Sequence, residues 1–282
     1  MDRIAVFGAG TMGHGIAQVC AQAGYQVRLY DISEQLVDRG LSRIRANLDK
    51  GVARGKVTEE GREAALSRLK GTTDMDVACE GAEFLIEAVP ERMELKHSLL
   101  SAIDERVPSS ALIGTNTSSM SIAEIASAAS NPGRVIGTHF FNPVHIMKLL
   151  EIVHHEASTD AVIETVLSFS ERIGKEPILV RNSPGFATSR LGVALGMEAI
   201  RMLEEGVASA EDIDKAMVLG YKHPIGPLRL TDMVGLDVRL AIGEYLAETL
   251  GNSAFQPPEL MREMVSQGKL GKKSGEGFYS WG

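Results

Sequence analysis

Two residues near the middle of the sequence could exchange a proton with a bound substrate: His139 and Glu151. Histidine is the side chain whose ordinary titration range suits a general base near neutral pH. His139 ends an apolar run, and Glu151 lies on the next apolar run along the chain. A carboxylate on the second imidazole nitrogen would fix the tautomer and the orientation of the ring. Such a pair can act as an oriented general base that removes a proton from a hydroxyl group.

The N-terminal segment carries a second chemical signature, a turn made of Gly8, Ala9, Gly10, Thr11, Met12 and Gly13. Gly8 permits a tight turn, Gly10 lets backbone amides approach a pyrophosphate, and Gly13 lets a helix pack closely on a strand. The N-terminus of that helix attracts a diphosphate. Asp31 ends the next strand about twenty residues later, where an acid accepts hydrogen bonds from ribose hydroxyls and repels a 2′-phosphate. The signature therefore predicts NAD rather than NADP.

Alternating strands and helices must bring these residues together. The apolar runs predict strands at 3–7, 25–31, 83–89, 111–115, 134–140, 148–153 and 177–180. Helical spacing predicts helices at 12–24, 34–69 with an interruption near 51–57, 95–107, 122–129 and 161–173. Such alternation favours a Rossmann-like, doubly wound α/β fold with a mainly parallel sheet. The polar clusters at 8–13, 31, 88–91, 116–119 and 138–143 then fall at the carboxyl edge, where ligands bind.

The pattern changes at Asn182, Ser183, Pro184 and Gly185. Beyond them only helices are predicted, at 186–205, 209–220, 226–250 and 258–266. This indicates an NAD-binding domain at 1–183, with a helical insertion at about 34–70, and an all-helical domain at 184–282. Apolar residues surround the helix at 226–250, so we expect it to be buried on most sides. The domain is small for that burial, which suggests a subunit interface.

Composition excludes several classes of function. A net charge of −8 argues against a nucleic-acid surface. Cys20, on a predicted helix, and Cys79, in a predicted loop, support neither a disulfide framework nor a metal site. No apolar run approaches the length of a membrane span, and a strand begins too early for a signal peptide. We therefore expect a cytoplasmic protein with no membrane partner.

The helix after Asp31 is locally basic, with Arg39, Arg43, Arg45, Lys50, Arg54 and Lys56. It is either a solvated helix face or a site for a phosphate-rich substrate handle. His14, in the first helical turn after the glycines, either borders a phosphate or is exposed, and we expect exposure. The other histidines are expected to be structural or solvated: His97, His145, His154, His155 and His223.

Eight short motifs occur in order: GAGTMGHGIA at 8–17, EAVPE at 87–91, NTSS at 116–119, HFFNP at 139–143, KLLE at 148–151, SPGF at 183–186, HPIGP at 223–227 and KKSGEGFY at 272–279. With them the sequence resembles the short-chain L-3-hydroxyacyl-CoA dehydrogenases along essentially its whole length, most closely the bacterial (S)-3-hydroxybutyryl-CoA enzymes. The resemblance implies NAD-dependent, reversible oxidation of an (S)-3-hydroxyacyl-CoA, such as 3-hydroxybutyryl-CoA, to the 3-ketoacyl-CoA. It also implies a homodimer made through the helical domain, and a cleft between the domains that closes on substrate.

The resemblance also assigns roles to residues. His139 matches the family's base, Glu151 its orienting carboxylate, and Ser118 its contact to the substrate oxygen. Five positions match contacts to NAD: Glu91, Lys96, Ser118, Asn142 and Lys273. The coenzyme A contacts match Asn47 and Arg54 in the basic helix, together with Ser118, which favours the phosphate-handle interpretation.

One position departs from the family pattern, because Ser189 stands where the family has a catalytic asparagine. Serine is shorter and lacks an amide, so we expect it to act through a bridging water or a relayed contact. Two other functions stay open. One is a dehydrogenase of free 3-hydroxyacids, and the other is a dinucleotide-binding protein without turnover, to which only Ser189 points.

Overall fold

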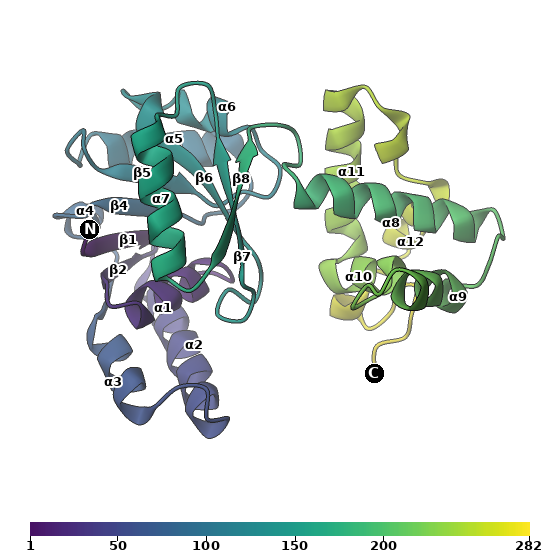
Figure 1. The fold of residues 1–282 in the computed structure, drawn as a ribbon, viewed down its shortest axis with the longest axis horizontal. Coiled ribbons are helices and arrows are strands. Elements are labelled where there is room, and N and C mark those ends of the chain that lie inside the picture. The colour runs from purple at the N-terminus through teal and green to yellow at the C-terminus, as the bar shows by residue number, and fades with distance from the viewer. The chain divides into compact units, whose positions relative to one another are not determined.

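The computed structural model describes residues 1–282 (Figure 1). The chain forms two compact units, Met1–Asn182 and Ser183–Gly282. All named strands lie in the first unit, and the second is built from helices and short helical turns. No helix is long and apolar enough to cross a lipid bilayer.

An eight-stranded sheet forms the centre of the first unit, in the order β3-β2-β1-β4-β5-β6-β7-β8. Its strands are β1 (Arg3–Phe7), β2 (Gln26–Tyr30), β3 (Leu69–Thr72), β4 (Phe84–Glu87), β5 (Leu112–Thr115), β6 (Val135–Phe140), β7 (Leu149–His154) and β8 (Glu176–Arg181). All neighbouring strands are parallel except β6 and β7, which are antiparallel. The order from β3 to β6 is that of a Rossmann-type sheet. The predicted fold class is therefore confirmed.

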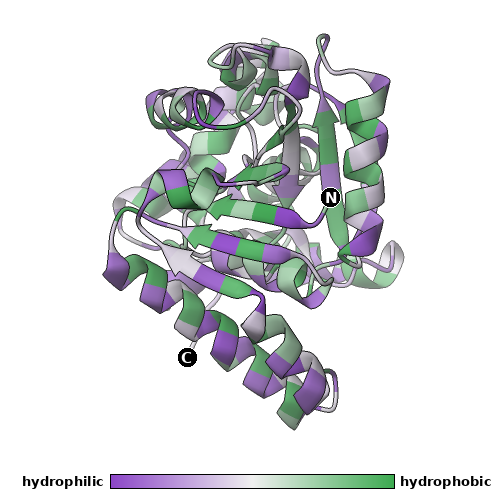
Figure 2. Ribbon diagram, turned by 90° about the vertical axis from the view of Figure 1, so that its left-hand side faces the viewer, coloured by the Kyte–Doolittle hydropathy of each residue, from purple (hydrophilic) through white to green (hydrophobic).

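Helices cover both faces of this sheet: α1 (Gly13–Gln22), α2 (Glu34–Ala53), α3 (Glu59–Ser67), α4 (Met75–Cys79), α5 (Met93–Asp104), α6 (Ile122–Ala126), the 3₁₀ turn η1 (Pro132–Arg134) and α7 (Asp160–Arg172). Side chains alternate between faces along each strand. On β1, Ile4 and Val6 enter one apolar core with residues of α1, α2 and α7. Ala5 and Phe7 enter a second core with residues of α5 and α6. Figure 2 shows hydrophilic and hydrophobic residues along the strands, and α2 with alternating hydrophilic and hydrophobic bands.

Two short elements of the first unit were not expected from the sequence. Strand β3 occupies Leu69–Thr72, where the helix was expected to end, and it is exposed or half-buried along its length. An edge strand of this kind needs no apolar alternation, so the sequence pattern misses it. The expected loop position of Cys79 is also wrong, because Cys79 is buried at the end of α4. Asp74 caps that helix by accepting hydrogen bonds from the amides of Asp76 and Val77.

The second unit contains α8 (Thr188–Glu204), α9 (Ala210–Lys215), the π-helical turn η2 (Ala216–Gly220), α10 (Pro227–Val234), α11 (Leu236–Leu250), the 3₁₀ turn η3 (Ser253–Phe255), α12 (Glu259–Ser266) and the 3₁₀ turn η4 (Lys272–Ser274). The single helix expected at 226–250 is wrong. Gly235, with φ of 107°, separates α10 from α11, because this backbone conformation favours glycine and cannot continue a helix. Burial on most sides is also wrong within this chain, since Met233, Val234 and Val238 are 52%, 43% and 41% exposed.

Candidate active site

Gly8 and Gly10 lie in the loop between β1 and α1, and Gly13 begins α1. The three glycines of the N-terminal signature have different structural environments. Gly8 has φ of 101°, and a Cβ there would lie 2.7 Å from the carbonyl oxygen of Ala88. A Cβ on Gly13 would lie 1.7 Å from the carbonyl oxygen of Gly8. A Cβ on Gly10 would meet no non-neighbouring atom within 4 Å. The fold therefore requires Gly8 and Gly13, whereas Gly10 leaves open space just before α1, where an anion would be received.

Asp31 is held against this loop. Its Oδ2 accepts the N–H of Ala9 at 2.7 Å, and its Oδ1 accepts the N–H of Ile32 at 2.7 Å. The acid that follows β2 is thereby fixed beside the glycine turn, as a ribose-binding acid must be.

His14 lies in the first turn of α1, with Nδ1 2.7 Å from the carbonyl oxygen of Gly10. Burial lowers the pKa of His14, the hydrogen bond with Gly10 opposes this, and Arg43 lowers the pKa further. The expected exposure of His14 is wrong, because the side chain is half-buried.

His139 and Glu151 face each other across the antiparallel pair β6 and β7, where they are direct register partners. Partners of this kind project their side chains from the same face of a sheet. The Nδ1 atom of His139 lies 2.6 Å from Oε2 of Glu151. Glu151 has no exposed surface and His139 is 6% exposed. An ionised carboxylate only accepts hydrogen bonds, so it favours the hydrogen on Nδ1 and leaves Nε2 as the basic nitrogen.

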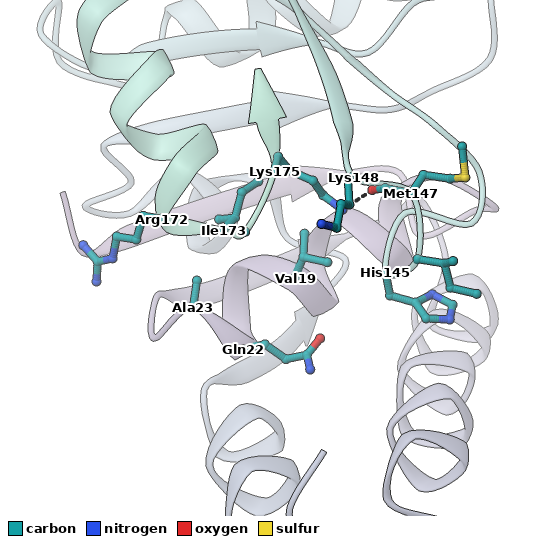
Figure 3. Close-up of a pocket in the computed structure, with 11 residues that line it drawn as sticks. Val19, Gln22, Ala23, His145, Met147, Lys148, Arg172, Ile173 and Lys175 are labelled. Carbon is teal, nitrogen blue, oxygen red and sulfur yellow. Dashed lines mark hydrogen bonds between the residues drawn. The ribbon is translucent and has the colours of Figure 1, made fainter. Parts of the chain in front are cut away.

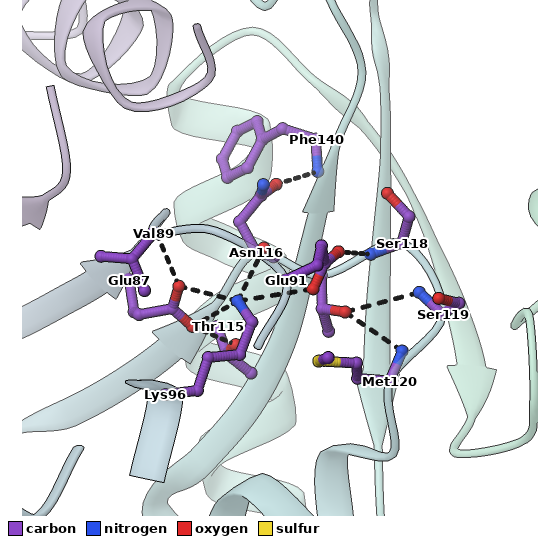
Figure 4. Close-up of polar contacts among 11 residues, drawn as sticks. Glu87, Val89, Glu91, Lys96, Thr115, Asn116, Ser118, Ser119, Met120 and Phe140 are labelled. Atoms are coloured by element: carbon purple, nitrogen blue, oxygen red, sulfur yellow. Dashed lines mark hydrogen bonds and ion pairs between the residues drawn. The ribbon is translucent and has the colours of Figure 1, made fainter. Parts of the chain in front are cut away.

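A buried ion pair lies at the carboxyl ends of β4 and β5 (Figure 4). Nζ of Lys96, on α5, donates to both carboxylate oxygens of Glu87 at 2.8 and 2.9 Å. The hydroxyl of Thr115 and the amide of Val89 also donate to Glu87, at 2.6 and 2.7 Å. Burial raises the pKa of Glu87, and these donors act in the opposite direction. Sequence reasoning assigned Glu87 no role, although it opens the EAVPE motif.

The same network reaches two of the predicted site residues. Oε1 of Glu91 accepts the backbone N–H of Ser118 at 2.7 Å, and Oε2 lies 3.7 Å from Nζ of Lys96 (Figure 4). Lys96 also donates to the carbonyl oxygen of Asn116 at 3.4 Å. Lys96 has no exposed surface, so in this conformation it holds other groups rather than meeting a ligand itself. Its direct contact with the cofactor stays a prediction.

Residues 3–183 match the family described as 3-hydroxyacyl-CoA dehydrogenase, NAD binding domain, and residues 185–281 match its C-terminal domain. The chain belongs to the 3-hydroxyacyl-CoA dehydrogenase family. The family resemblance expected from the sequence motifs is therefore confirmed.

Individual relatives in this family cover the whole chain. A probable 3-hydroxybutyryl-CoA dehydrogenase of Bacillus subtilis is 41% identical over 100% of this chain and 98% of that protein. A 3-hydroxyadipyl-CoA dehydrogenase of Escherichia coli is 43% identical over 100% of this chain and 59% of that longer protein. The crystal structure of (S)-3-hydroxybutyryl-CoA dehydrogenase from Ralstonia eutropha has a TM-score of 0.97 and 42% identity, and covers 100% of this chain and 99% of that one.

The other residues that the family resemblance assigns lie on several elements of the two units. Asn142 is exposed in the loop after β6, and Nδ2 of Asn47, on α2, donates to Gln18 at 3.1 Å. Arg54 is exposed at the end of α2. In the second unit, Ser189 lies in the first turn of α8, and Nζ of Lys273 contacts both carboxylate oxygens of Asp237 at 2.5 and 2.6 Å. The functional roles of all these residues stay predictions.

A cavity of about 430 Å³ opens beside α1, α7 and the loop before β7, and none of the family's predicted site residues lines it (Figure 3). Its titratable lining residues are His145, Lys148, Arg172 and Lys175. Nζ of Lys175 donates to the carbonyl oxygens of Met147 and Val144, and burial lowers the pKa of Lys175. This lysine therefore ties down the loop between β6 and β7, which follows His139.

Proposed function

We propose that this chain catalyses the reversible, NAD-dependent oxidation of an (S)-3-hydroxyacyl-CoA to the 3-ketoacyl-CoA, with 3-hydroxybutyryl-CoA and acetoacetyl-CoA as its substrate pair. Membership of the 3-hydroxyacyl-CoA dehydrogenase family supports the reaction class. The names of full-length relatives about 40% identical support the four-carbon substrate. The observation that carries the proposal is the buried contact of 2.6 Å between His139 and Glu151.

His139 takes the hydroxyl proton of the substrate on Nε2 while hydride leaves C3, and in the reverse direction the imidazolium returns that proton. Glu151 keeps the hydrogen on Nδ1 and stabilises the imidazolium charge, because it is buried and bonded to the ring. Ser118 positions the substrate oxygen. General acid–base catalysis of this kind contributes about 10²–10⁴-fold to the rate.

The residues around the glycine loop fit NAD. The open space at Gly10 and the adjoining start of α1 suit the pyrophosphate, and Asp31, tied to Ala9, suits the ribose hydroxyls. When bound, NAD accepts the hydride. The carboxylate of Asp31 repels a 2′-phosphate, so NADP is the poorer cofactor. Glu91 holds the backbone of Ser118 and thereby orders the loop between cofactor and substrate.

The proposal includes a coenzyme A handle on α2 and a homodimer. Asn47 and Arg54 lie on one helix whose positive side chains attract the phosphates of coenzyme A. In the second unit, the exposed apolar side chains of Met233, Val234 and Val238 support a subunit interface.

The experiment compares initial rates of NADH formation with 3-hydroxybutyryl-CoA and with free 3-hydroxybutyrate. We expect turnover of the thioester, with far lower efficiency on the free acid. Arg54→Gln should raise KM for the thioester about two- to fivefold, the scale of an exposed ion pair. Lys70→Gln, which changes an exposed basic side chain on β3 outside this helix, is the control and should leave KM unchanged. Equal efficiency on the free acid, or no NADH from either compound, would overturn the proposal.

A further inference from the structure

The strand that carries His139 is supported unequally by its two neighbours. Strand β7 pairs with β6 as far as Phe140, which lies opposite Leu150. Strand β5 pairs with it only as far as Gly137, which lies opposite Thr115. His139 and Phe140 therefore lie beyond the end of the β5 ladder, and their backbone needs another support on that side.

Asn116, the first residue after β5, provides that support through its side chain. Its Oδ1 accepts the N–H of Phe140 at 3.0 Å, in a buried contact (Figure 4). A side-chain oxygen thus takes the place of the next backbone carbonyl in the ladder. Phe140 is 2% exposed, so water is a poor substitute partner for this N–H. The bond fixes the backbone one residue beyond His139.

Asn116 is itself held by the buried ion pair described above. Its N–H donates to the carbonyl oxygen of Glu87 at 2.7 Å, and its own carbonyl oxygen accepts from Lys96 at 3.4 Å. Lys96 is bound in turn to the carboxylate of Glu87. Because both backbone polar groups of Asn116 are engaged, its side chain has a defined base from which to hold β6.

We propose that Asn116 is a positioning residue for His139, holding the end of β6 so that the imidazole stays in register with Glu151. The inference rests on the proposed function, in which His139 is the base. The N–H of Phe140 is a donor, so it must face the oxygen of the amide rather than the nitrogen. An aspartate at this position can keep the contact, and an alanine cannot.

The variants Asn116→Ala and Asn116→Asp test the contribution of the acceptor oxygen, because alanine removes it and aspartate keeps it. We expect Asn116→Ala to lower kcat about 10- to 100-fold, the scale of a misplacement near the reacting atoms. KM for NAD and for the thioester should stay within about twofold, because neither binding surface is removed. Asn116→Asp should restore most of kcat, since it retains the acceptor. Equal losses in both variants, or a loss no larger than the fall in folded protein, would overturn the proposal.

Asn131→Ala is the matched control at the other end of the same strand. Oδ1 of Asn131 accepts the N–H of Gly133 at 3.1 Å, just before β6 begins. This variant also removes an asparagine acceptor from a backbone amide, but far along the strand from His139. It should leave kcat unchanged.

A spectroscopic readout separates failure of this inference from failure of the proposed function. A histidine Nδ1–H bound to a carboxylate gives a strongly downfield proton resonance, which His139→Gln would assign by its loss. In protein without substrate, the resonance should shift or broaden in Asn116→Ala and persist in Asn116→Asp and Asn131→Ala. An unchanged resonance in Asn116→Ala overturns the positioning role, even if the reaction proves to be a different one. Wild-type protein inactive on 3-hydroxybutyryl-CoA overturns the proposed function instead.

Discussion

At each end of β6 a basic side chain contacts a carboxylate, and the two basic side chains are of different types. At the start, Arg134 contacts Asp104 and donates to the carbonyl oxygens of Pro108 and Ala111 at 2.6 and 3.2 Å. At the end, His139 contacts Glu151 at 2.6 Å. Arginine stays protonated at any working pH, whereas histidine gains and loses its proton near neutrality. One strand thus has an arginine contact suited to stabilising the fold at one end and a histidine contact suited to proton transfer at the other.

Of the changes at the two ends of β6, removal of the His139 imidazole should have the largest effect. His139→Gln removes the base but leaves an amide that can still hydrogen-bond Glu151, so the fold should persist. We expect kcat to fall about 10²–10⁴-fold, the usual contribution of general acid–base catalysis. Steady-state assays with the thioester, together with thermal unfolding, measure both effects. Near-normal turnover would show that His139, like Arg134, only stabilises the structure.

Neutralising the carboxylate at the same end should have the next largest effect. Glu151→Gln keeps the size of the side chain and an oxygen acceptor, but it no longer stabilises an imidazolium. We expect kcat to fall about 10²-fold through this loss and through poorer orientation of the ring. Glu176→Gln on β8 is the control, because Glu176 and its partner Lys148 are exposed and such pairs contribute little. A similar loss of kcat in the control would contradict the proposed role of Glu151 in orienting His139 and stabilising its imidazolium form.

At the other end, Asp104→Asn should change stability rather than rate. Burial acts to raise the pKa of Asp104, but hydrogen bonds from Arg134 and Ser130 lower it overall. A lowered pKa stabilises the fold above the unfolded-state value of about 3.9, and this stabilisation disappears as pH falls through the folded-state pKa. At pH about 7 we expect the variant to lose about 1–2 kcal/mol of unfolding free energy.

Denaturant unfolding from neutral to acid pH measures this difference between wild type and Asp104→Asn. The difference should shrink below pH about 4, where the carboxylate of the unfolded chain takes up its proton. The rate per folded molecule should not change. A stability difference that stays constant down to strongly acid pH would contradict the assignment of Asp104 to a charged pair.

The sequence alone predicts the fold class and the family, and both predictions are confirmed. Its failures have two causes, which are contacts distant in the chain and a local backbone conformation that an apolar pattern does not reveal. Strand β3 exists because β2 offers it an edge, since its own residues Leu69–Thr72 carry no apolar alternation. The break at Gly235 interrupts an apolar pattern that continues on both sides of it.

The candidate site shows the same division. His139 and Glu151 could be proposed together because their strands are close in sequence, and the structure brings them into contact. The contact between Asn116 and Phe140 could not be predicted in this way. It requires β5 and β6 to be neighbours in the sheet, and their pairing to stop at Gly137 while β6 continues to Phe140. Lys96 could be matched to a family position, but its complete burial against Glu87 depends on how α5 packs against β4. The catalytic roles of these residues stay predictions.

The three glycines Gly8, Gly10 and Gly13 differ in whether the protein would need them without a cofactor. A descendant of this chain that had abandoned its cofactor would still keep Gly8 and Gly13, because a side chain at either would collide with backbone. Gly10 alone would be released to drift, since the protein itself leaves that space empty. In this chain the turn itself thus accounts for Gly8 and Gly13, whereas a bound dinucleotide would account for Gly10.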